Sequence, residues 1–226
     1  MLNHAIRYQP IVRTLERWRP ARILEVGSGP EGLALFWRGT VVGTDVVFKR
    51  RPLHRAVVAS GLRLPFADRS FPLVVSCDML EHVTPVQRCA AVQEMARVAD
   101  EGLLLVFPSG PAAVAVYNEL AEALAPALPQ WLQEHITNGL PDAGEVAAWL
   151  RQAGWVVNVQ WYESAAAHKK LMLYENHWPV KVATFALMRL VGPRFVRLVG
   201  WPSAGPWLRV LIKAERPAQQ HADLTA

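Results

Sequence analysis

The sequence is poor in cysteine, in charge and in uninterrupted apolar runs. Its 226 residues include two cysteines, Cys77 and Cys89, which are too few for a disulfide scaffold and whose spacing matches no zinc-binding pattern. The most apolar stretch, residues 180–201, is interrupted by four basic residues and cannot supply the roughly 20 apolar residues of a transmembrane helix. The first 18 residues lack the apolar block of a signal peptide. We therefore expect a cytoplasmic protein.

Charged residues make up 19% of the chain and hydrophobic residues 52%, which is typical of a globular protein with a sizeable core. Residues 1–164 carry 15 Lys and Arg against 16 Asp and Glu, whereas residues 165–216 carry 9 against 2. Because the basic residues are confined to one segment, they do not favour general nucleic-acid binding. Length and composition predict one domain over residues 1–216, with a frayed tail over residues 217–226.

Short apolar runs alternate with helical segments in the first half of the chain. The pattern predicts a helix within residues 1–20 and strands over residues 21–26, 40–44, 54–59, 73–76 and 103–107. Thr84, Pro85 and Gln87 are typical of a helix start with a capping box. Strands that alternate with helices at this spacing indicate an α/β fold, with a parallel sheet covered on both faces.

The second half carries more helix and fewer strands. An Ala-rich segment over residues 111–129 is expected to be helical, and Asp142 with Glu145 predicts the start of a helix that runs to Gly154. Two further strands are expected over residues 155–162 and 207–214. Between them, residues 165–206 form a basic, Trp-rich insertion that we expect to be mostly helical, because structureless loops of that length are uncommon.

A glycine-rich turn follows the first expected strand, with glycines at positions 27, 29 and 32. Glycines allow a tight turn and close approach of a ligand to the backbone, as in dinucleotide-binding folds. Glu25, however, places a carboxylate beside the position of a pyrophosphate, which favours a ligand that carries an ammonium or sulfonium group. Asp45 ends the second strand, where a carboxylate can accept both hydroxyls of a ribose. These features predict a nucleoside-containing cofactor.

Residues 61–83 read GLRLPFADRSFPLVVSCDMLEHV. This stretch, with EVGSG at residues 25–29 and VGTD at residues 42–45, resembles the class I S-adenosylmethionine-dependent methyltransferases, in particular their small-molecule, type 11-like branch. The resemblance spans residues 20–110. It implies a Rossmann-like sheet of seven mostly parallel strands with the last one antiparallel. It also implies helical insertions after the fifth strand and between the last two strands, at residues 111–140 and 165–206.

The resemblance implies that S-adenosylmethionine is the cofactor, and it assigns contacts to matching positions. Glu25 and the Gly27 and Gly29 backbone would face its methionine part, Asp45 its ribose, and Val46 its adenine. Ser60 stands where the family often has an adenine-binding Asp, and Pro72 also departs from the pattern. The expected cofactor-binding residues are Glu25, Gly27, Ser28, Gly29, Asp45, Val46, Ser60, Gly61, Leu62 and Cys77.

Candidate catalytic groups are few. Cys77 could accept a methyl group, but we interpret it as a small residue that lines the cofactor pocket. His82 is a candidate general base, since the ordinary pKa of histidine suits proton removal near neutral pH; the alternative is a histidine that shapes its loop. His135 and His177 are further candidates in the second half. Histidines scattered in this way do not predict a metal site.

The predicted reaction is methyl transfer to an O, N or C nucleophile of a small molecule. The basic insertion could be a helical lid, a binding segment for an anionic or amphiphilic acceptor, or a membrane-surface contact. Two rival functions remain: a non-catalytic, cofactor-binding or scaffold descendant of the fold, and a nicotinamide-dependent oxidoreductase. The oxidoreductase would leave Glu25 and the LPFADRSF stretch unexplained.

Overall fold

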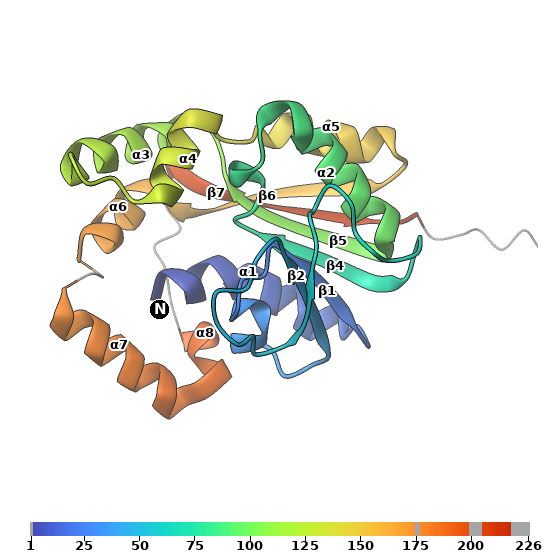
Figure 1. Ribbon diagram of the computed structural model, residues 1–226, viewed down its shortest axis with the longest axis horizontal. Coiled ribbons are helices and arrows are strands. Elements are labelled where there is room, and N and C mark those ends of the chain that lie inside the picture. The colour runs from blue at the N-terminus through green and yellow to red at the C-terminus, as the bar shows by residue number, and fades with distance from the viewer. Residues whose placement is uncertain (1, 175–176, 199–204, 218–226) are drawn as a thin grey trace, which may run out of the picture.

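A computed structural model describes residues 2–174, 177–198 and 205–217. Its centre is one sheet of seven strands in the order β3-β2-β1-β4-β5-β7-β6 (Figure 1). The strands are β1 (Ile23–Val26), β2 (Val41–Asp45), β3 (Arg55–Val58), β4 (Phe71–Cys77), β5 (Ala99–Pro108), β6 (Val156–Ser164) and β7 (Trp207–Glu215). All neighbouring pairs are parallel except those of β7, which is antiparallel to both β5 and β6. The predicted α/β fold with an antiparallel last strand is confirmed.

Helices cover both faces of the sheet, because the central strands are apolar on both sides. Leu103, Leu105 and Phe107 of β5 pack in one cluster with α2 (Pro85–Val98) and α5 (Ala143–Gln152). Leu104 and Val106, which point the other way, pack in a second cluster with α1 (Leu2–Trp18). Figure 1 shows α2 and α5 on one face and α1 on the other.

Two predicted helix starts turn out differently. At α5, Asp142 Oδ1 accepts a hydrogen bond of 2.9 Å from the Glu145 backbone N–H, as the sequence predicts. At α2, the predicted capping box is wrong: Thr84 Oγ1 donates to Gln87 Oε1 at 2.9 Å and caps no backbone N–H. Two polar side chains that bond to each other are no longer available to the helix end.

The pairing of β4 with β5 is irregular at the start of β4. The strand begins at Phe71, two residues earlier than the sequence predicts, and its pairing with β5 shifts between Phe71 and Leu73. Pro72 lies at this shift, near the beginning of the strand. Proline has no backbone N–H to donate to a neighbouring strand. It is tolerated here because the hydrogen-bond ladder between β4 and β5 is already interrupted at this position.

Two helical insertions confirm the predicted helical content of the second half. The first holds α3 (Pro111–Leu124) and α4 (Gln130–Asn138), and the second α6 (Ala165–Tyr174), α7 (Trp178–Val191) and α8 (Phe195–Leu198). α7 extends away from the sheet (Figure 1). Residues 199–204 of the expected insertion and most of the expected tail lie outside the described residues. Within the described ranges, no helix is both long and apolar enough to cross a membrane.

Candidate active site

The glycine turn after β1 brings the backbone close to the next element. Gly27 has φ +76°, and a Cβ atom at that position would lie 2.5 Å from Met79 Cγ, so no larger residue fits without rearrangement. The Gly27 and Ser28 backbone N–H groups both donate to the Thr44 carbonyl, at 2.8 and 3.0 Å. Gly29 N–H donates to Asp45 Oδ2 at 2.9 Å. These bonds join the turn to the carboxyl end of β2.

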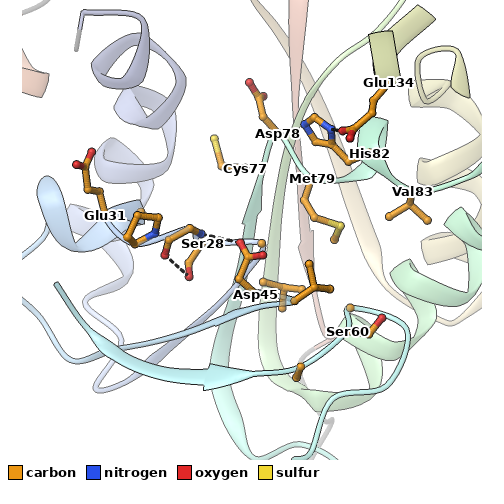
Figure 2. A pocket seen from close by; sticks show the side chains of 18 of the residues that line it. Ser28, Glu31, Asp45, Ser60, Cys77, Asp78, Met79, His82, Val83 and Glu134 are labelled. Carbon is orange, nitrogen blue, oxygen red and sulfur yellow. Dashed lines mark hydrogen bonds and ion pairs between the residues drawn. The ribbon is translucent and has the colours of Figure 1, made fainter. Parts of the chain in front are cut away.

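A pocket of about 700 Å³ opens where the parallel strands β1, β2, β3 and β4 end (Figure 2). The structure brings together in its lining all but one of the cofactor-binding residues expected from the sequence, and the candidate base His82. These residues are Gly27, Ser28, Gly29, Asp45, Val46, Ser60, Gly61, Leu62, Cys77 and His82. Parallel strands place their carboxyl ends along one crevice, which is why residues 50 positions apart meet here.

Glu25 is the exception. Its carboxylate is fully buried behind the pocket, where Tyr8 Oη donates to Oε1 at 2.7 Å and the Leu33 N–H donates to Oε2 at 2.8 Å. Burial raises the pKa of Glu25 to about 7, although both hydrogen bonds act in the opposite direction. Glu25 is thus outside the lining of the pocket and its two oxygens already have donors, and its contact with the methionine part of a cofactor stays a prediction. Tyr8, which the sequence analysis did not single out, lines the pocket.

The remaining groups fit a nucleoside with an alkylated sulfur. Asp45 Oδ2 is bonded to Gly29, whereas Oδ1 has only a long 3.5 Å contact from the Val47 N–H and can accept further bonds. Val46 beside it is 67% exposed and offers an apolar wall. The Ser60 hydroxyl accepts from the Leu62 N–H at 3.2 Å. Burial raises the pKa of Cys77 well above its ordinary value, so its side chain stays a neutral thiol.

A second cavity of about 280 Å³ adjoins the first and shares Arg7, Asp78 and His82 with it. Its remaining lining residues come from the 3-10 turn Leu80–His82, the helical insertions and the last strand. They are Glu81, Tyr117, Trp131, His135, His168, Met172 and Arg209. The sequence predicted insertions over the active-site edge, and α3, α4 and α6 supply most of this lining.

A buried ionic network forms one wall of this second cavity. Arg209 donates from Nε and Nη2 to the two oxygens of Asp78, at 3.0 and 2.7 Å, and also binds Glu163. Arg7 reaches the same Asp78 at 3.0 Å, and His168 Nδ1 contacts Glu163 at 2.7 Å. Burial opposes ionisation of Asp78, yet the two guanidinium groups hold its pKa well below its ordinary value. Sequence reasoning missed this network, since bonded partners such as Arg209 and Asp78 lie 131 positions apart and form no motif.

Two histidines and Glu81 also line the second cavity, and Glu134 lies beside them in the lining of the larger pocket. His82 Nδ1 lies 2.5 Å from Glu134 Oε2, as Figure 2 shows, and Gln130 Nε2 donates to the other Glu134 oxygen at 2.8 Å. His135 lies beside them, with Nε2 3.8 Å from Glu81 Oε1. Burial lowers the pKa of His135 to about 3, so its ring is neutral. His177, the third candidate, lies at the start of the α7 segment and lines neither cavity.

Comparison with known proteins is consistent with this geometry. Residues 24–107 match a family model described as a methyltransferase domain. Magnesium protoporphyrin IX methyltransferase from Synechocystis PCC 6803, with bound S-adenosylhomocysteine, has a TM-score of 0.55 at 13% identity, over 93% of this chain and 84% of that one. The YcgJ protein of Bacillus subtilis has a TM-score of 0.55 at 17% identity, over 95% of this chain and 98% of that one. An S-adenosylmethionine-dependent methyltransferase from Archaeoglobus fulgidus has a TM-score of 0.52 at 15% identity, over 92% of this chain and 94% of that one. No curated protein matches the sequence significantly.

The solved structures establish the fold, and the family match over residues 24–107 includes most of the residues that line the larger pocket. The pocket itself carries the glycine turn and the Asp45 carboxylate that a nucleoside cofactor requires. Together, these findings support a class I methyltransferase fold with a methyltransferase domain over residues 24–107 and a pocket suited to S-adenosylmethionine.

Proposed function

We propose that the enzyme methylates an O, N or C nucleophile of a small molecule that binds in the second cavity. The observation that carries this proposal is the shared lining of the two cavities. Arg7, Asp78 and His82 face both, so an acceptor in the smaller cavity would lie directly beside a cofactor in the larger one. Alignment of two reactants and exclusion of water account for much of the rate of such a transfer.

The residues of the larger pocket would hold the cofactor as follows. Asp45 Oδ1 would accept from the ribose hydroxyls, while the bond from Gly29 to Oδ2 keeps the carboxylate oriented. Val46 and the backbone of Gly61 and Leu62 would border the adenine, and the Gly27 turn would border the methionine part. When bound, S-adenosylmethionine supplies a methyl group whose bond to sulfur is already activated. The protein therefore needs no covalent nucleophile, which agrees with the buried thiol of Cys77.

The charges of the second cavity favour an uncharged acceptor over an anionic one. Its two arginines, Arg7 and Arg209, are both paired with carboxylates, so neither offers an uncompensated positive charge. Tyr117 and Trp131 supply aromatic walls, with their rings 6.2 Å apart. Such walls fit an acceptor with a flat or apolar body and one polar group to be methylated.

The cofactor assignment can be tested by calorimetric titration with S-adenosylmethionine and S-adenosylhomocysteine, with a nicotinamide dinucleotide as the comparison ligand. We expect S-adenosylmethionine and S-adenosylhomocysteine to bind with micromolar affinity and the nicotinamide dinucleotide not to bind. Asp45→Ala should weaken it by about 2–4 kcal/mol, because two charge-assisted bonds are lost. The matched control is Asp68→Ala, whose side chain is 75% exposed and lines neither cavity. Tight binding of the dinucleotide instead would overturn the proposal.

Turnover needs a separate measurement, because a non-catalytic descendant of the fold would bind the cofactor equally well. We expect a panel of uncharged aromatic acceptors, assayed for release of S-adenosylhomocysteine, to include a substrate. Cofactor binding with no release of S-adenosylhomocysteine across a broad panel would favour the non-catalytic role.

We also propose that the enzyme acts as a single domain over residues 1–216 in the cytoplasm, without nucleic-acid partners.

A further inference from the structure

We propose that Glu81, His82 and His135 form a binding site for a divalent transition-metal ion, which holds a hydroxyl-bearing acceptor beside the cofactor pocket. The inference rests on the proposed function for its acceptor, but the metal site stands on its own observations. One carboxylate oxygen of Glu81 and one ring nitrogen of each histidine all lie within 4.8 Å of one another. No other group of three potential ligands with this spacing occurs among the described residues.

The first observation is that these buried polar atoms lack partners. Glu81 is 0% exposed and His135 6% exposed. Neither carboxylate oxygen of Glu81 has a hydrogen-bond partner in another residue, and neither ring nitrogen of His135 has one. Buried polar groups are nearly always satisfied, because an unpaired one loses its hydration and gains nothing in return. Two such residues face each other at 3.8 Å, which is too long for a hydrogen bond between them.

The second observation is the donor set. Two histidines and one carboxylate are typical ligands of Zn²⁺ or Fe²⁺, whereas Mg²⁺ and Ca²⁺ prefer oxygen ligands alone. Ligand bonds to such ions are about 2.0–2.2 Å long, so two donors of a tetrahedral ion lie about 3.4 Å apart. The three donors here all lie within 4.8 Å of one another, so the side chains would have to move inward by up to about 1.4 Å to bind the ion. Three ligands also leave a coordination position open to the cavity.

The third observation is the support behind His82. Its Nδ1 contacts Glu134, which is itself held by Gln130, so the other ring nitrogen, Nε2, is left for an ion. Ligating histidines characteristically bind a carboxylate through their second nitrogen, which fixes the ring and its tautomer. The Glu81–His82 pair comes from the 3-10 turn Leu80–His82, and the Glu134–His135 pair from α4, which packs against that turn. Two consecutive pairs, one from the turn and one from α4, thus lie side by side.

An ion at this position would decide the type of acceptor. Glu81, His82 and His135 all line the second cavity, so an open position of the ion would face that cavity. Because His82 lines both cavities, an oxygen bound to the ion would lie next to the cofactor pocket. A divalent ion lowers the pKa of a coordinated hydroxyl. The acceptor proton would pass to solvent, the oxygen would form the new bond to the methyl carbon, and the electron pair of the broken bond would stay on sulfur. The inference therefore narrows the nucleophile to oxygen.

The test uses untagged, chelator-treated full-length protein titrated with Zn²⁺ in a calorimeter, with Co²⁺ absorption in the visible range as a second probe of coordination. We expect one Zn²⁺ per chain. Glu81→Gln and His135→Gln should each weaken Zn²⁺ binding by 100-fold or more, and Glu134→Gln by about 10-fold, since it acts through His82. His177→Ala, an exposed histidine that lines neither cavity, should leave Zn²⁺ affinity unchanged.

Two further readouts keep the outcome decisive. Glu81→Gln keeps the shape of the side chain, so its Tm without metal should equal or exceed that of the native protein, while Zn²⁺ should raise the Tm of the native protein alone. Affinity for S-adenosylhomocysteine should stay within twofold in Glu81→Gln and His135→Gln, because neither residue lines the larger pocket. Absence of one-to-one Zn²⁺ binding in protein that still binds S-adenosylhomocysteine would overturn the metal site. Zn²⁺ binding that survives both substitutions would overturn it as well. Zn²⁺ binding without S-adenosylhomocysteine binding would overturn the proposed function alone.

Discussion

At the scale of single residues, Glu25 combines complete burial with a titratable carboxylate. Tyr8 and the Leu33 N–H hold its two oxygens, and the side chain carries no cationic partner. A Cβ atom at Gly32 would lie 2.3 Å from Glu25 Oε2, so the glycine turn is shaped around this carboxyl group. Glu25 therefore acts on the cofactor pocket through Tyr8 and through the turn.

The raised pKa of Glu25 predicts a definite pH dependence of stability. Because burial raises its pKa from about 4.5 to about 7, the folded protein binds more protons than the unfolded chain between these values. The free energy of unfolding should therefore fall as pH rises from 5 to 7, and level off above 7. The free energy of unfolding of Glu25→Gln, relative to that of the native protein, should increase by about 2–3 kcal/mol from pH 5 to pH 8. Urea unfolding at intervals of one pH unit measures this difference.

The control for that measurement is Glu122→Gln, an exposed carboxylate on α3. Glu25→Gln should differ from the native protein in its pH dependence by more than Glu122→Gln does, because Glu122 is exposed and Glu25 is fully buried. A pH-independent difference for Glu25→Gln would mean that the carboxyl group is ionised in the folded protein throughout this range.

At the scale of elements, Arg88 of α2 holds together the parts that carry the proposed metal ligands. Its Nε donates to the carbonyls of Leu80 and Val83, at 3.2 and 3.1 Å. Its Nη2 donates to the carbonyls of Asn138 and Gly139, at 2.9 and 2.5 Å. One side chain thus satisfies the last carbonyls of α4 and those of the 3-10 turn at the same time. The position of α4 relative to the turn depends on these bonds.

Arg88→Met should destabilise the protein by about 2–3 kcal/mol, because it leaves several carbonyls without their charged donor. The flexible side chain of methionine preserves most of the packing of the arginine side chain. The decrease in the free energy of unfolding therefore measures chiefly the lost hydrogen bonds. Urea unfolding measures the change, and Arg151→Met, an exposed arginine on α5, serves as the control with an expected change within 0.5 kcal/mol. Equal effects of the two substitutions would contradict this role for Arg88.

At the scale of the whole molecule, the network around Arg209 ties the sheet to the insertions. Arg209 is 1% exposed and joins Asp78 at the end of β4 to Glu163 near the end of β6. His168 of α6 and Arg7 of α1 complete the network from either side. The two positive and two negative side chains balance, so the burial of each ion is compensated by its neighbours.

Arg209→Met should destabilise the protein by about 3–5 kcal/mol, because it leaves buried carboxylates without their main partner. Arg209→Lys should recover only part of the loss, since an ammonium group cannot form the two parallel bonds to Asp78. The control is Lys213→Met on the same strand, a partly exposed residue whose ion pair is worth at most about 1 kcal/mol. A full recovery by lysine, measured by chemical unfolding, would show that charge alone matters at this position.

The sequence by itself determined the parallel part of the sheet, the glycine turn and the place of Asp45, because apolar strands and the turns that follow them are local patterns and parallel strands end at one edge. The antiparallel last strand and further pocket positions such as Ser60 and Gly61 were implied by the family resemblance. Only the tertiary structure decided the orientation of Glu25 and the choice of Gln87 as the partner of Thr84. It alone brought α4 to the 3-10 turn and Arg209 to Asp78. Such contacts depend on how the insertions pack, and a polar side chain bonds to whichever partner packing brings within reach.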